Sequence, residues 1–454
     1  MIVRADRPIT DVLFRGVHAV DVRAELDGVV DVLVTGGHIA RIAPAGSLDV
    51  EEVGGLQVVD GAGLHLFPGF FDPHVHLRTP GQGYKETIAT GTASAAAGGF
   101  TAIVAMPNTN PVVDSPAVFR ALLEEAASEA IVGVGFTACI TKGMSGDELT
   151  EMAALKELGA VAFTDDGKPV ADAQIFRMAC RYQQLTDSVL MLHEEEPSLS
   201  GGGAMNEGAV SAALGISGQP NIAESTLIAR DAAIAGYEGA RVHVQHLSTS
   251  ESLAEVRTAR ERGVQITCEA SPHHLLLTDE ACRTLDTHTK MNPPLRSETD
   301  RQALIAAVLD GTIDCIATDH APHSRDEKAL PFEQAPFGVT GLETSFSACY
   351  TELVLKHGLE LSRLVELMAS GAELVDQTPP SLIEGEPADL CLVDLERRWT
   401  VGADGYLSKS GNCAFDGMEL QSKVVLTLSH GSVAYADASV GLTASTPDTA
   451  TTHA

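Results

Sequence analysis

Short apolar stretches with strand character alternate with helical patterns through most of this 454-residue chain. Strands are predicted over residues 64–71, 101–106, 131–138, 160–164, 189–192, 241–245, 265–269 and 313–317. Helices are predicted over residues 87–97, 116–128, 145–158, 172–184, 223–235 and 251–261. This alternation is typical of a (β/α)8 TIM-like barrel, here with insertions. A doubly wound open sheet is the alternative, but no Gly-x-Gly-x-x-Gly motif follows an early strand to favour it.

Both ends of the chain are predicted to form short β segments. These cover residues 11–14, 29–35, 39–43 and 56–60, and then residues 389–394, 423–429 and 433–436. Because isolated strands need sheet partners, we expect one small composite β-sandwich domain built from both ends. The expected organisation is residues 1–66 and 381–436 in the sandwich, residues 67–380 in the barrel, and a disordered tail over residues 437–454.

The charge of the chain restricts its partners. With 30 Lys and Arg against 62 Asp and Glu, the formal charge is −32, so neither nucleic acid nor an anionic membrane is expected. The chain begins without the blocks of a signal peptide, and no apolar run approaches the ~18 residues that span a bilayer. The eight cysteines form no Cys-x-x-Cys pair, which predicts reduced thiols and a cytoplasmic protein.

Residue types that bind metals collect where the predicted barrel strands end. His74 and His76 follow the first strand, and their spacing points both imidazoles to one face. Later strand ends carry Asp165, Asp166, His193, His246 and Asp319. One such histidine is more often a hydrogen-bonded core residue, and Asp-Asp-Gly is usually a turn. Their joint placement at strand ends nevertheless favours a metal site, because barrel chemistry occurs at the carboxyl face.

The number of these side chains indicates more than one metal ion. Four imidazoles and two carboxylates exceed the three or four protein ligands of a single zinc ion. They suit two metals about 3.5–4 Å apart that share a bridging carboxylate. Such a pair acidifies water and polarises a carbonyl, so the predicted chemistry is the opening or closing of an amide-like bond. Asp319 is placed to bind metal and to transfer a proton as general base and then acid.

Five motifs narrow this chemistry further. They are Asp72 to Arg78 (DPHVHLR), Met106 to Thr109 (MPNT), Phe163 to Gly167 (FTDDG), Lys290 to Arg296 (KMNPPLR) and Ala317 to His323 (ATDHAPH). Together they resemble the motifs of bacterial class I dihydroorotases of the amidohydrolase superfamily. The resemblance runs from Gly61 to Glu343 and agrees with a composite β domain at the chain ends. His-x-His marks only the superfamily, whereas the fourth and fifth motifs are much narrower.

This resemblance implies a zinc-dependent, reversible cyclisation of N-carbamoyl-L-aspartate to dihydroorotate in pyrimidine synthesis. It implies that one zinc is held by His74 and His76, the other by His193 and His246, with Asp166 between them and Asp319 as ligand and acid/base. It assigns substrate binding to Arg78, Asn108, Asn292, His323, Phe337 and Gly338. Many superfamily members bridge the metals with a carboxylated lysine instead. Here Lys168 follows the glycine turn, so Asp166 is the better match.

Two alternatives remain open at this point. A hydantoinase- or allantoinase-like cyclic amidase would share the metals without needing the carboxylate grip of Arg78, Asn108 and His323. A catalytically silent barrel that serves as a scaffold for a transcarbamoylase would have lost a metal ligand, and none is missing here. The expected partners are a small-molecule substrate, further copies of this chain in a homo-oligomer, and an aspartate transcarbamoylase.

Overall fold

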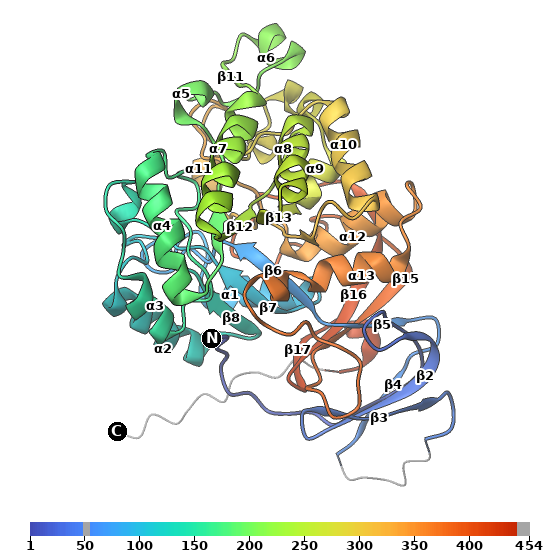
Figure 1. The fold of residues 1–454 in the computed structure, drawn as a ribbon. Helices are drawn as coiled ribbons and strands as arrows, with labels where there is room; N and C mark the ends of the chain where they lie inside the picture. The colour runs from blue at the N-terminus through green and yellow to red at the C-terminus, as the bar shows by residue number, and fades with distance from the viewer. Residues whose placement is uncertain (49–54, 443–454) are drawn as a thin grey trace.

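Strands from both ends of the chain pair in one eight-stranded sheet in the computed structural model, which describes residues 1–48 and 55–442. The strands are β1 (Val12–Asp21), β2 (Leu26–Thr35), β3 (His38–Pro44), β4 (Gln57–Asp60), β5 (His65–Pro68), β15 (Leu390–Thr400), β16 (Glu419–Ser429) and β17 (Ser432–Ala436). Their order is β17-β16-β15-β5-β1-β2-β3, and β4 pairs with β1. The antiparallel pair of β5 and β15 joins the two chain ends (Figure 1).

Parallel strands from the middle of the chain pair in a closed circuit. They are β6 (Phe70–Val75), β7 (Phe100–Ala105), β8 (Gly133–Phe136), β9 (Leu190–Leu192), β12 (Arg241–Val244), β13 (Gln265–Ala270) and β14 (Cys315–Ile316). One sheet has the order β6-β7-β8 and the other β14-β13-β12-β9. Phe163 forms parallel bridges to Ala138 and Leu190 between the two sheets, and Val75 bridges His320 on the other side. The carboxyl ends of all these segments therefore face the same end of the circuit.

Helices follow most of these strands along the chain. The longer helices are α1 (Ile88–Ala97), α2 (Pro116–Glu129), α3 (Met152–Leu158), α4 (Ala173–Thr186), α7 (Ile222–Glu238), α8 (Ser250–Glu261), α10 (Glu298–Leu309) and α13 (Leu361–Ala369). Short ones are α5 (Pro197–Ser200), α6 (Ala209–Leu214), α9 (Pro272–Leu276), α11 (Arg325–Lys328), α12 (Ser345–Cys349) and α14 (Gly371–Leu374). The small strands β10 (Met205–Asn206) and β11 (Gly218–Gln219) pair beside α5 and α6 at the top of Figure 1.

Local sequence explains where these elements form. Every residue of β6, β7 and β8 is buried, as expected for parallel strands that are covered on both faces. Thr87 and Thr90 form a reciprocal capping box that begins α1, and the Asp172 carboxylate caps α4. Phe70 stacks on Phe346 with ring centroids 5.2 Å apart, in the largest hydrophobic cluster. This cluster joins the circuit to the helices around it.

The apolar run over residues 64–71 differs from our prediction of one strand. It is divided between β5, which pairs in the eight-stranded sheet, and β6, which pairs in the circuit. Gly69 lies at the division, where its N–H donates to Asp389 O at 2.9 Å. A Cβ atom at this position would collide with the Thr101 side chain, so only glycine lets the chain pass from one sheet to the other. Periodicity could not reveal this break, because both halves are buried.

Three further segments differ from the sequence prediction. Residues 160–164 form no strand, and only Phe163 makes bridges there. The helix predicted over residues 145–158 begins only at Met152, because Gly143 and Gly146 hold turns with positive φ before it. Residues 437–442 of the expected tail lie against the sheet, where Asp437 pairs with Arg397 at 3.2 Å. Residues 443–454 of that tail lie outside the described residues.

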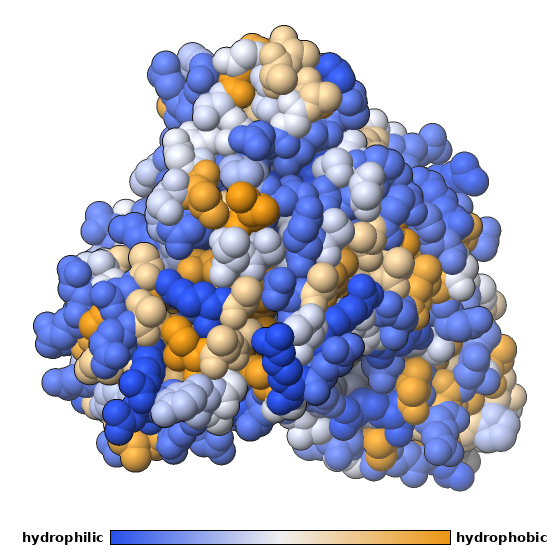
Figure 2. Space-filling view, turned by 45° about the horizontal axis from the view of Figure 1, so that its top comes forward, coloured by the Kyte–Doolittle hydropathy of each residue, from blue (hydrophilic) through white to orange (hydrophobic). Residues whose placement is uncertain are grey.

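Hydrophilic side chains cover most of the face in Figure 2, and hydrophobic residues form smaller patches between them. Among residues 1–48 and 55–442, no helix combines the length and the apolar character that a membrane span requires.

Candidate metal and substrate site

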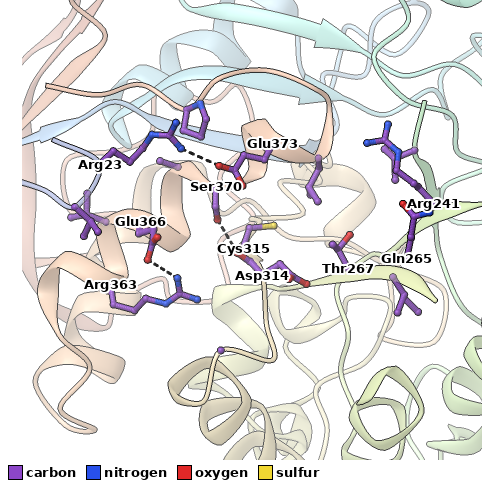
Figure 3. A pocket seen from close by; sticks show the side chains of 18 of the residues that line it. Arg23, Arg241, Gln265, Thr267, Asp314, Cys315, Arg363, Glu366, Ser370 and Glu373 are labelled. Atoms are coloured by element: carbon purple, nitrogen blue, oxygen red, sulfur yellow. Dashed lines mark hydrogen bonds and ion pairs between the residues drawn. The ribbon is translucent and has the colours of Figure 1, made fainter. Parts of the chain in front are cut away.

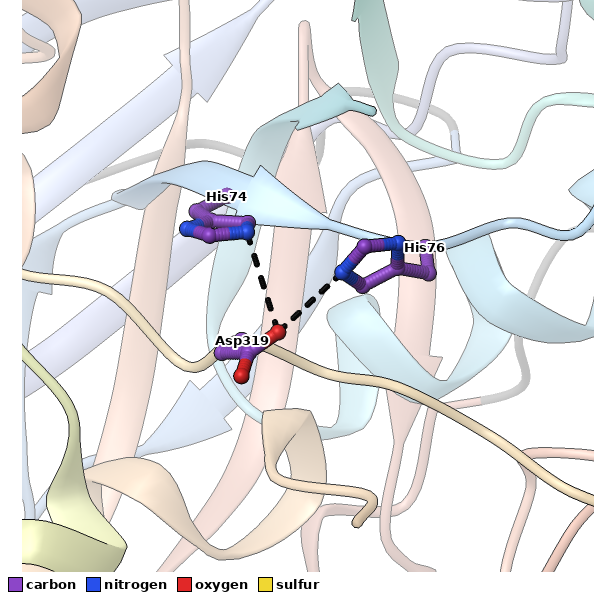
Figure 4. A group of neighbouring side chains, drawn as sticks. All are labelled: His74, His76 and Asp319. Carbon is purple, nitrogen blue, oxygen red and sulfur yellow. Dashed lines mark hydrogen bonds and ion pairs between the residues drawn. The ribbon is translucent and has the colours of Figure 1, made fainter. Parts of the chain in front are cut away.

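His74 and His76 face Asp319 from one side, as Figure 4 shows. His74 lies in β6, His76 follows it directly, and Asp319 lies three residues after the end of β14. The Nε2 atoms of His76 and His74 lie 3.1 and 3.7 Å from Oδ1 of Asp319. The three side chains are almost completely buried. The predicted convergence of the first and last strand ends is therefore present in the structure.

Asp166 lies between the four histidines. Its Oδ1 atom is 3.4 Å from His74 Nε2, 3.9 Å from His193 Nδ1 and 4.0 Å from His246 Nε2. Its Oδ2 atom is 3.5 Å from His76 Nε2. Two triads bring their ligand atoms within 4.8 Å of one another, namely His74, His76 and Asp319, and His74, Asp166 and His246. This set of imidazole nitrogens and carboxylate oxygens fits zinc and neighbouring divalent ions.

The neighbours of Asp166 in the sequence do not share its position. Asp165 turns to the preceding loop, where its Oδ1 atom accepts the N–H groups of Ile140 and Thr141 at 2.8 and 3.1 Å. Burial raises the pKa of Asp165 to about 6, although these hydrogen bonds oppose the shift. Lys168 is exposed to solvent. Of these three residues, only Asp166 lies among the imidazoles.

Three polar side chains hold the ring nitrogens that point away from this centre. Glu269 Oε1 lies 2.6 Å from His74 Nδ1, and Asn108 Oδ1 lies 2.9 Å from His76 Nδ1. Glu195 Oε2 lies 3.2 Å from His193 Nε2. Such contacts fix the tautomer and the orientation of a histidine that binds a metal through its other nitrogen.

Sequence reasoning missed the parts that Glu269 and Glu195 play. Glu269 stands near the end of β13, as the candidate ligands do at their own strands, so its position was a usable signal. Glu195 lies within a run of three glutamates, and nothing distinguishes it from its neighbours in sequence.

Asn108 also differs from expectation. Its amide nitrogen donates to Asp166 Oδ2 at 3.0 Å while its oxygen faces His76, so the whole amide connects two candidate ligands.

The charges around the centre favour the ionised form of Asp166 and the neutral form of His246, whereas the carboxylates raise the pKa of His74 and His193. Burial alone would raise the pKa of Asp166, but His74, His76 and His193 hold it far below its ordinary value. Burial, together with the neighbouring His193 and His74, lowers the pKa of His246 well below the usual range. An ionised carboxylate and a neutral imidazole are the forms that bind metal ions.

Three residues of the site have backbone conformations that side chains rarely adopt. Arg78, His246 and Asp319 have φ values of 59°, 31° and 48°. Each follows or ends a barrel segment, and this left-handed conformation turns the side chain into the site. Strain of this kind costs energy and persists where the surrounding structure enforces it, most often at functional sites.

A cavity of about 210 Å³ lies at this centre. It is lined by His76, Arg78, Asn108, Asp166, Gly167, His193, His246, Asn292, Asp319, Ala321, His323, Phe337 and Gly338. Every residue that the sequence assigned to the site therefore lines it, except the fully buried His74. Arg78 Nη2 lies 3.2 Å from His323 Nε2 in its wall, and Asn292 donates to Glu195 at 2.7 Å. The candidate metal ligands and the candidate carboxylate-binding groups thus share one pocket.

A larger cavity of about 690 Å³ lies at the amino ends of β12, β13 and β14 (Figure 3). Its charged groups are matched in ion pairs. Arg23 lies 3.0 Å from Glu373, and Arg363 lies 2.6 Å from Glu366. The converging imidazoles and carboxylates of the predicted site are in the smaller pocket, at the opposite ends of the strands.

Comparison with known proteins identifies the family of this chain. The dihydro-orotase-like family profile matches residues 63–252. The chain is 45% identical over 422 residues to a dihydroorotase of Desulforapulum autotrophicum. The matched region covers 93% of this chain and 98% of that protein. It is 44% identical over 426 residues to a dihydroorotase of Citrifermentans bemidjiense, with 94% and 99% covered. The chain belongs to the dihydroorotase family.

Solved structures of related folds extend over the same length. The L-hydantoinase (dihydropyrimidinase) of Arthrobacter aurescens superposes with a TM-score of 0.83 at 26% identity, covering 96% of this chain and 98% of that one. A dihydropyrimidinase of Brevibacillus agri gives a TM-score of 0.79 at 22% identity, with 93% and 95% covered. The second likeness establishes the fold alone.

Proposed function

We propose that this protein is a dihydroorotase, a cyclic amidohydrolase that interconverts N-carbamoyl-L-aspartate and (S)-dihydroorotate plus water in de novo pyrimidine (UMP) synthesis. Relatives that carry this name match the chain at 42–45% identity. The observation that carries the proposal is the presence of Arg78 and His323 in the same pocket as the candidate metal ligands. The substrate has a carboxylate beside the reacting amide, and so needs both kinds of group.

The proposed fold is a (β/α)8 barrel with a composite β-sandwich domain. The closed circuit of parallel pairs supports the barrel, and the sheet from both chain ends supports the second domain. We place the barrel in residues 69–380, because residues 67 and 68 belong to β5 of the eight-stranded sheet, and we place the candidate site at the carboxyl end of the barrel, where such barrels carry their chemistry. A cytoplasmic location and assembly into a homo-oligomer or with an aspartate transcarbamoylase belong to the proposal as well.

Two zinc ions complete the proposed site. His74 and His76 would hold one, His193 and His246 the other, while Asp166 would contact both and Asp319 would add a further ligand. When bound, zinc lowers the pKa of a water molecule and polarises the amide carbonyl. Glu269, Asn108 and Glu195 contact the ring nitrogens that point away from the metal site. These contacts would keep the imidazoles in the tautomers that zinc binding needs.

The protein's own side chains orient the substrate. Arg78 presents a planar guanidinium to the pocket, which suits a two-bond contact with a carboxylate. His323 is placed beside it to donate to the same group. Asn108 also lines the pocket, and we therefore keep it among the residues that bind the substrate. Asn292 lines the pocket where it would face the substrate ring. Phe337 and Gly338 form the adjoining wall.

Asp319 is the proposed acid/base. Ring opening requires a base that takes a proton from the attacking water and an acid that returns it to the leaving ring nitrogen. The Asp319 carboxylate lies in the pocket wall, and its Oδ1 atom is 3.1 Å from His76 Nε2. Ring closure would use the same carboxyl group in the opposite order, by microscopic reversibility.

The competing function is a hydantoinase-like cyclic amidase, which the likeness to the Arthrobacter aurescens enzyme favours. The test is to assay the purified protein with dihydroorotate, hydantoin and allantoin, alongside metal analysis. We expect turnover of dihydroorotate alone, with zinc present and activity lost after chelation. Turnover of hydantoin at a higher kcat/KM would replace the proposal. Zinc-loaded protein that turns over none of the three would favour the scaffold role.

A further inference from the structure

His323 lies between two basic side chains in the pocket wall. Its Nδ1 atom is 3.3 Å from Lys85 Nζ, and its Nε2 atom is 3.2 Å from Arg78 Nη2. The Nε2 atom also lies 2.7 Å from the carbonyl oxygen of Phe337. All three contacting groups are fixed in kind, because ammonium and guanidinium groups only donate and a carbonyl only accepts. Nε2 thus faces both a donor, Arg78, and an acceptor, Phe337 O, and the shorter contact, 2.7 Å to the carbonyl, decides which ring nitrogen carries the proton.

The proton belongs on Nε2. A hydrogen on Nδ1 would point at the Lys85 ammonium, since Glu327 Oε2 lies 3.6 Å from Nδ1, too far for a hydrogen bond. Nε2 would then place a lone pair against the lone pairs of Phe337 O. With the hydrogen on Nε2, Nδ1 accepts from Lys85 and Nε2 donates to Phe337 O. A doubly protonated ring is opposed by burial and by Arg78, Lys85 and Lys328, which hold the pKa of His323 far below its ordinary value.

Lys85 is itself held firmly. It lies in the loop between β6 and α1 and is 8% exposed. Its ammonium group is 2.9 Å from Glu327 Oε1 in α11, and Glu327 also closes the capping box with Ser324. The lysine thus bridges a loop and a helix that lie on either side of His323. Neither the motifs nor the proposed ligands include it.

We propose that Lys85 is a positioning residue that holds His323 in the Nε2–H tautomer, so that His323 and Arg78 donate together to the substrate carboxylate. A carboxylate oxygen beside both groups would take the Nε2 hydrogen that Phe337 O accepts here. This inference rests on the proposed function, because it names the group that binds the carboxylate of dihydroorotate. Without Lys85, the Nδ1–H tautomer becomes accessible, and that form offers the substrate a lone pair.

A double-mutant cycle tests the link between Lys85 and His323. Lys85→Met should raise KM for dihydroorotate roughly tenfold, the effect of weakening one hydrogen bond to a charged group, with kcat within about twofold. In a His323→Ala background the same substitution should change KM less than about twofold. Lys409→Met is the matched control, because Lys409 also contacts this loop, at Gly83 O, without touching His323. It should leave both constants unchanged.

The parent protein provides a second, independent measurement. The ¹⁵N shifts of His323, assigned by their loss in His323→Asn, should show a neutral ring protonated on Nε2, and Lys85→Met should add the other tautomer. An Nδ1–H ring in the parent, or equal KM effects of Lys85→Met in both backgrounds, would overturn the inference. A parent without dihydroorotate turnover would instead refute the proposed function, and the ¹⁵N shifts would still decide the role of Lys85.

Discussion

The Nδ1 atom of His74 lies 2.6 Å from Oε1 of Glu269, and both side chains are completely buried. The same carboxylate accepts the backbone N–H of His246 at 3.1 Å and lies 3.0 Å from His243 Nε2. A carboxylate only accepts hydrogen bonds when ionised, so His74 carries a proton on Nδ1 and turns Nε2 toward Asp166, 3.4 Å away. One buried glutamate therefore orients two of the four proposed histidine ligands.

Glu269→Gln should weaken metal retention about 10- to 100-fold, because the amide keeps the shape but loses the anion that orients His74. Zinc content after competition with a graded series of chelators measures this. Glu352→Gln is the control, since Glu352 is a buried carboxylate that pairs with Arg301 at 2.7 Å away from the site. Parental zinc affinity in Glu269→Gln would show that this glutamate serves the fold alone.

Arg78→Lys should raise KM for dihydroorotate about tenfold or more while zinc content stays at the parental value. Lysine keeps the charge but cannot form the planar two-bond fork to a carboxylate. Steady-state kinetics and metal analysis on the same preparation measure the two quantities. Unchanged substrate affinity would remove Arg78 from the carboxylate grip, whereas a loss of zinc would make its role structural.

Asp319→Asn should depress ring opening and ring closure together, by roughly 100-fold or more, because the amide can neither accept nor return the proton. Both directions are measured in the variant after reconstitution to parental zinc content. Retained activity in either direction would leave Asp319 as a metal ligand only.

Lys328 gives a prediction about stability and pH. Burial, helped by the nearby Lys290, lowers the pKa of Lys328 from 10.5 to about 7, and its ammonium group donates to the carbonyl of Thr287 at 2.9 Å. Between pH 7 and pH 10.5 the unfolded chain binds this proton more tightly than the folded protein, so stability rises with pH. The gain between pH 7 and pH 10 is up to about 4 kcal/mol.

Lys328→Met removes that contribution. The Tm of the parent minus the Tm of the variant should therefore increase as the pH is raised from 7 to 10, whatever the sign of the difference at pH 7. Differential scanning calorimetry at matched metal content measures both values. A Tm difference that does not change with pH would mean that the carbonyls around Lys328 keep it charged throughout this range.

Local patterns in the sequence were enough to predict the order of strands and helices and the residue types of the site. The strands β6, β7 and β8 are buried along their whole length, and the candidate ligands His74 and His76 stand at the end of the first of them. His74 and His76 share a face because alternate residues of an extended chain must do so. Placement at strand ends then predicted that His193, His246 and Asp319 would meet them, and the structure brings them together.

Tertiary structure alone decided which groups surround those ligands. Periodicity reports that a segment is buried, but it does not report which distant side chain it meets. Asn412, from the loop between β15 and β16, accepts the backbone N–H of His323 at 3.1 Å, across 89 residues of chain. Lys85 reaches the imidazole of the same residue, and Glu269 reaches His74, only because the strands of the circuit close on one another. Contacts of this kind depend on the packing of whole elements, which no local pattern encodes.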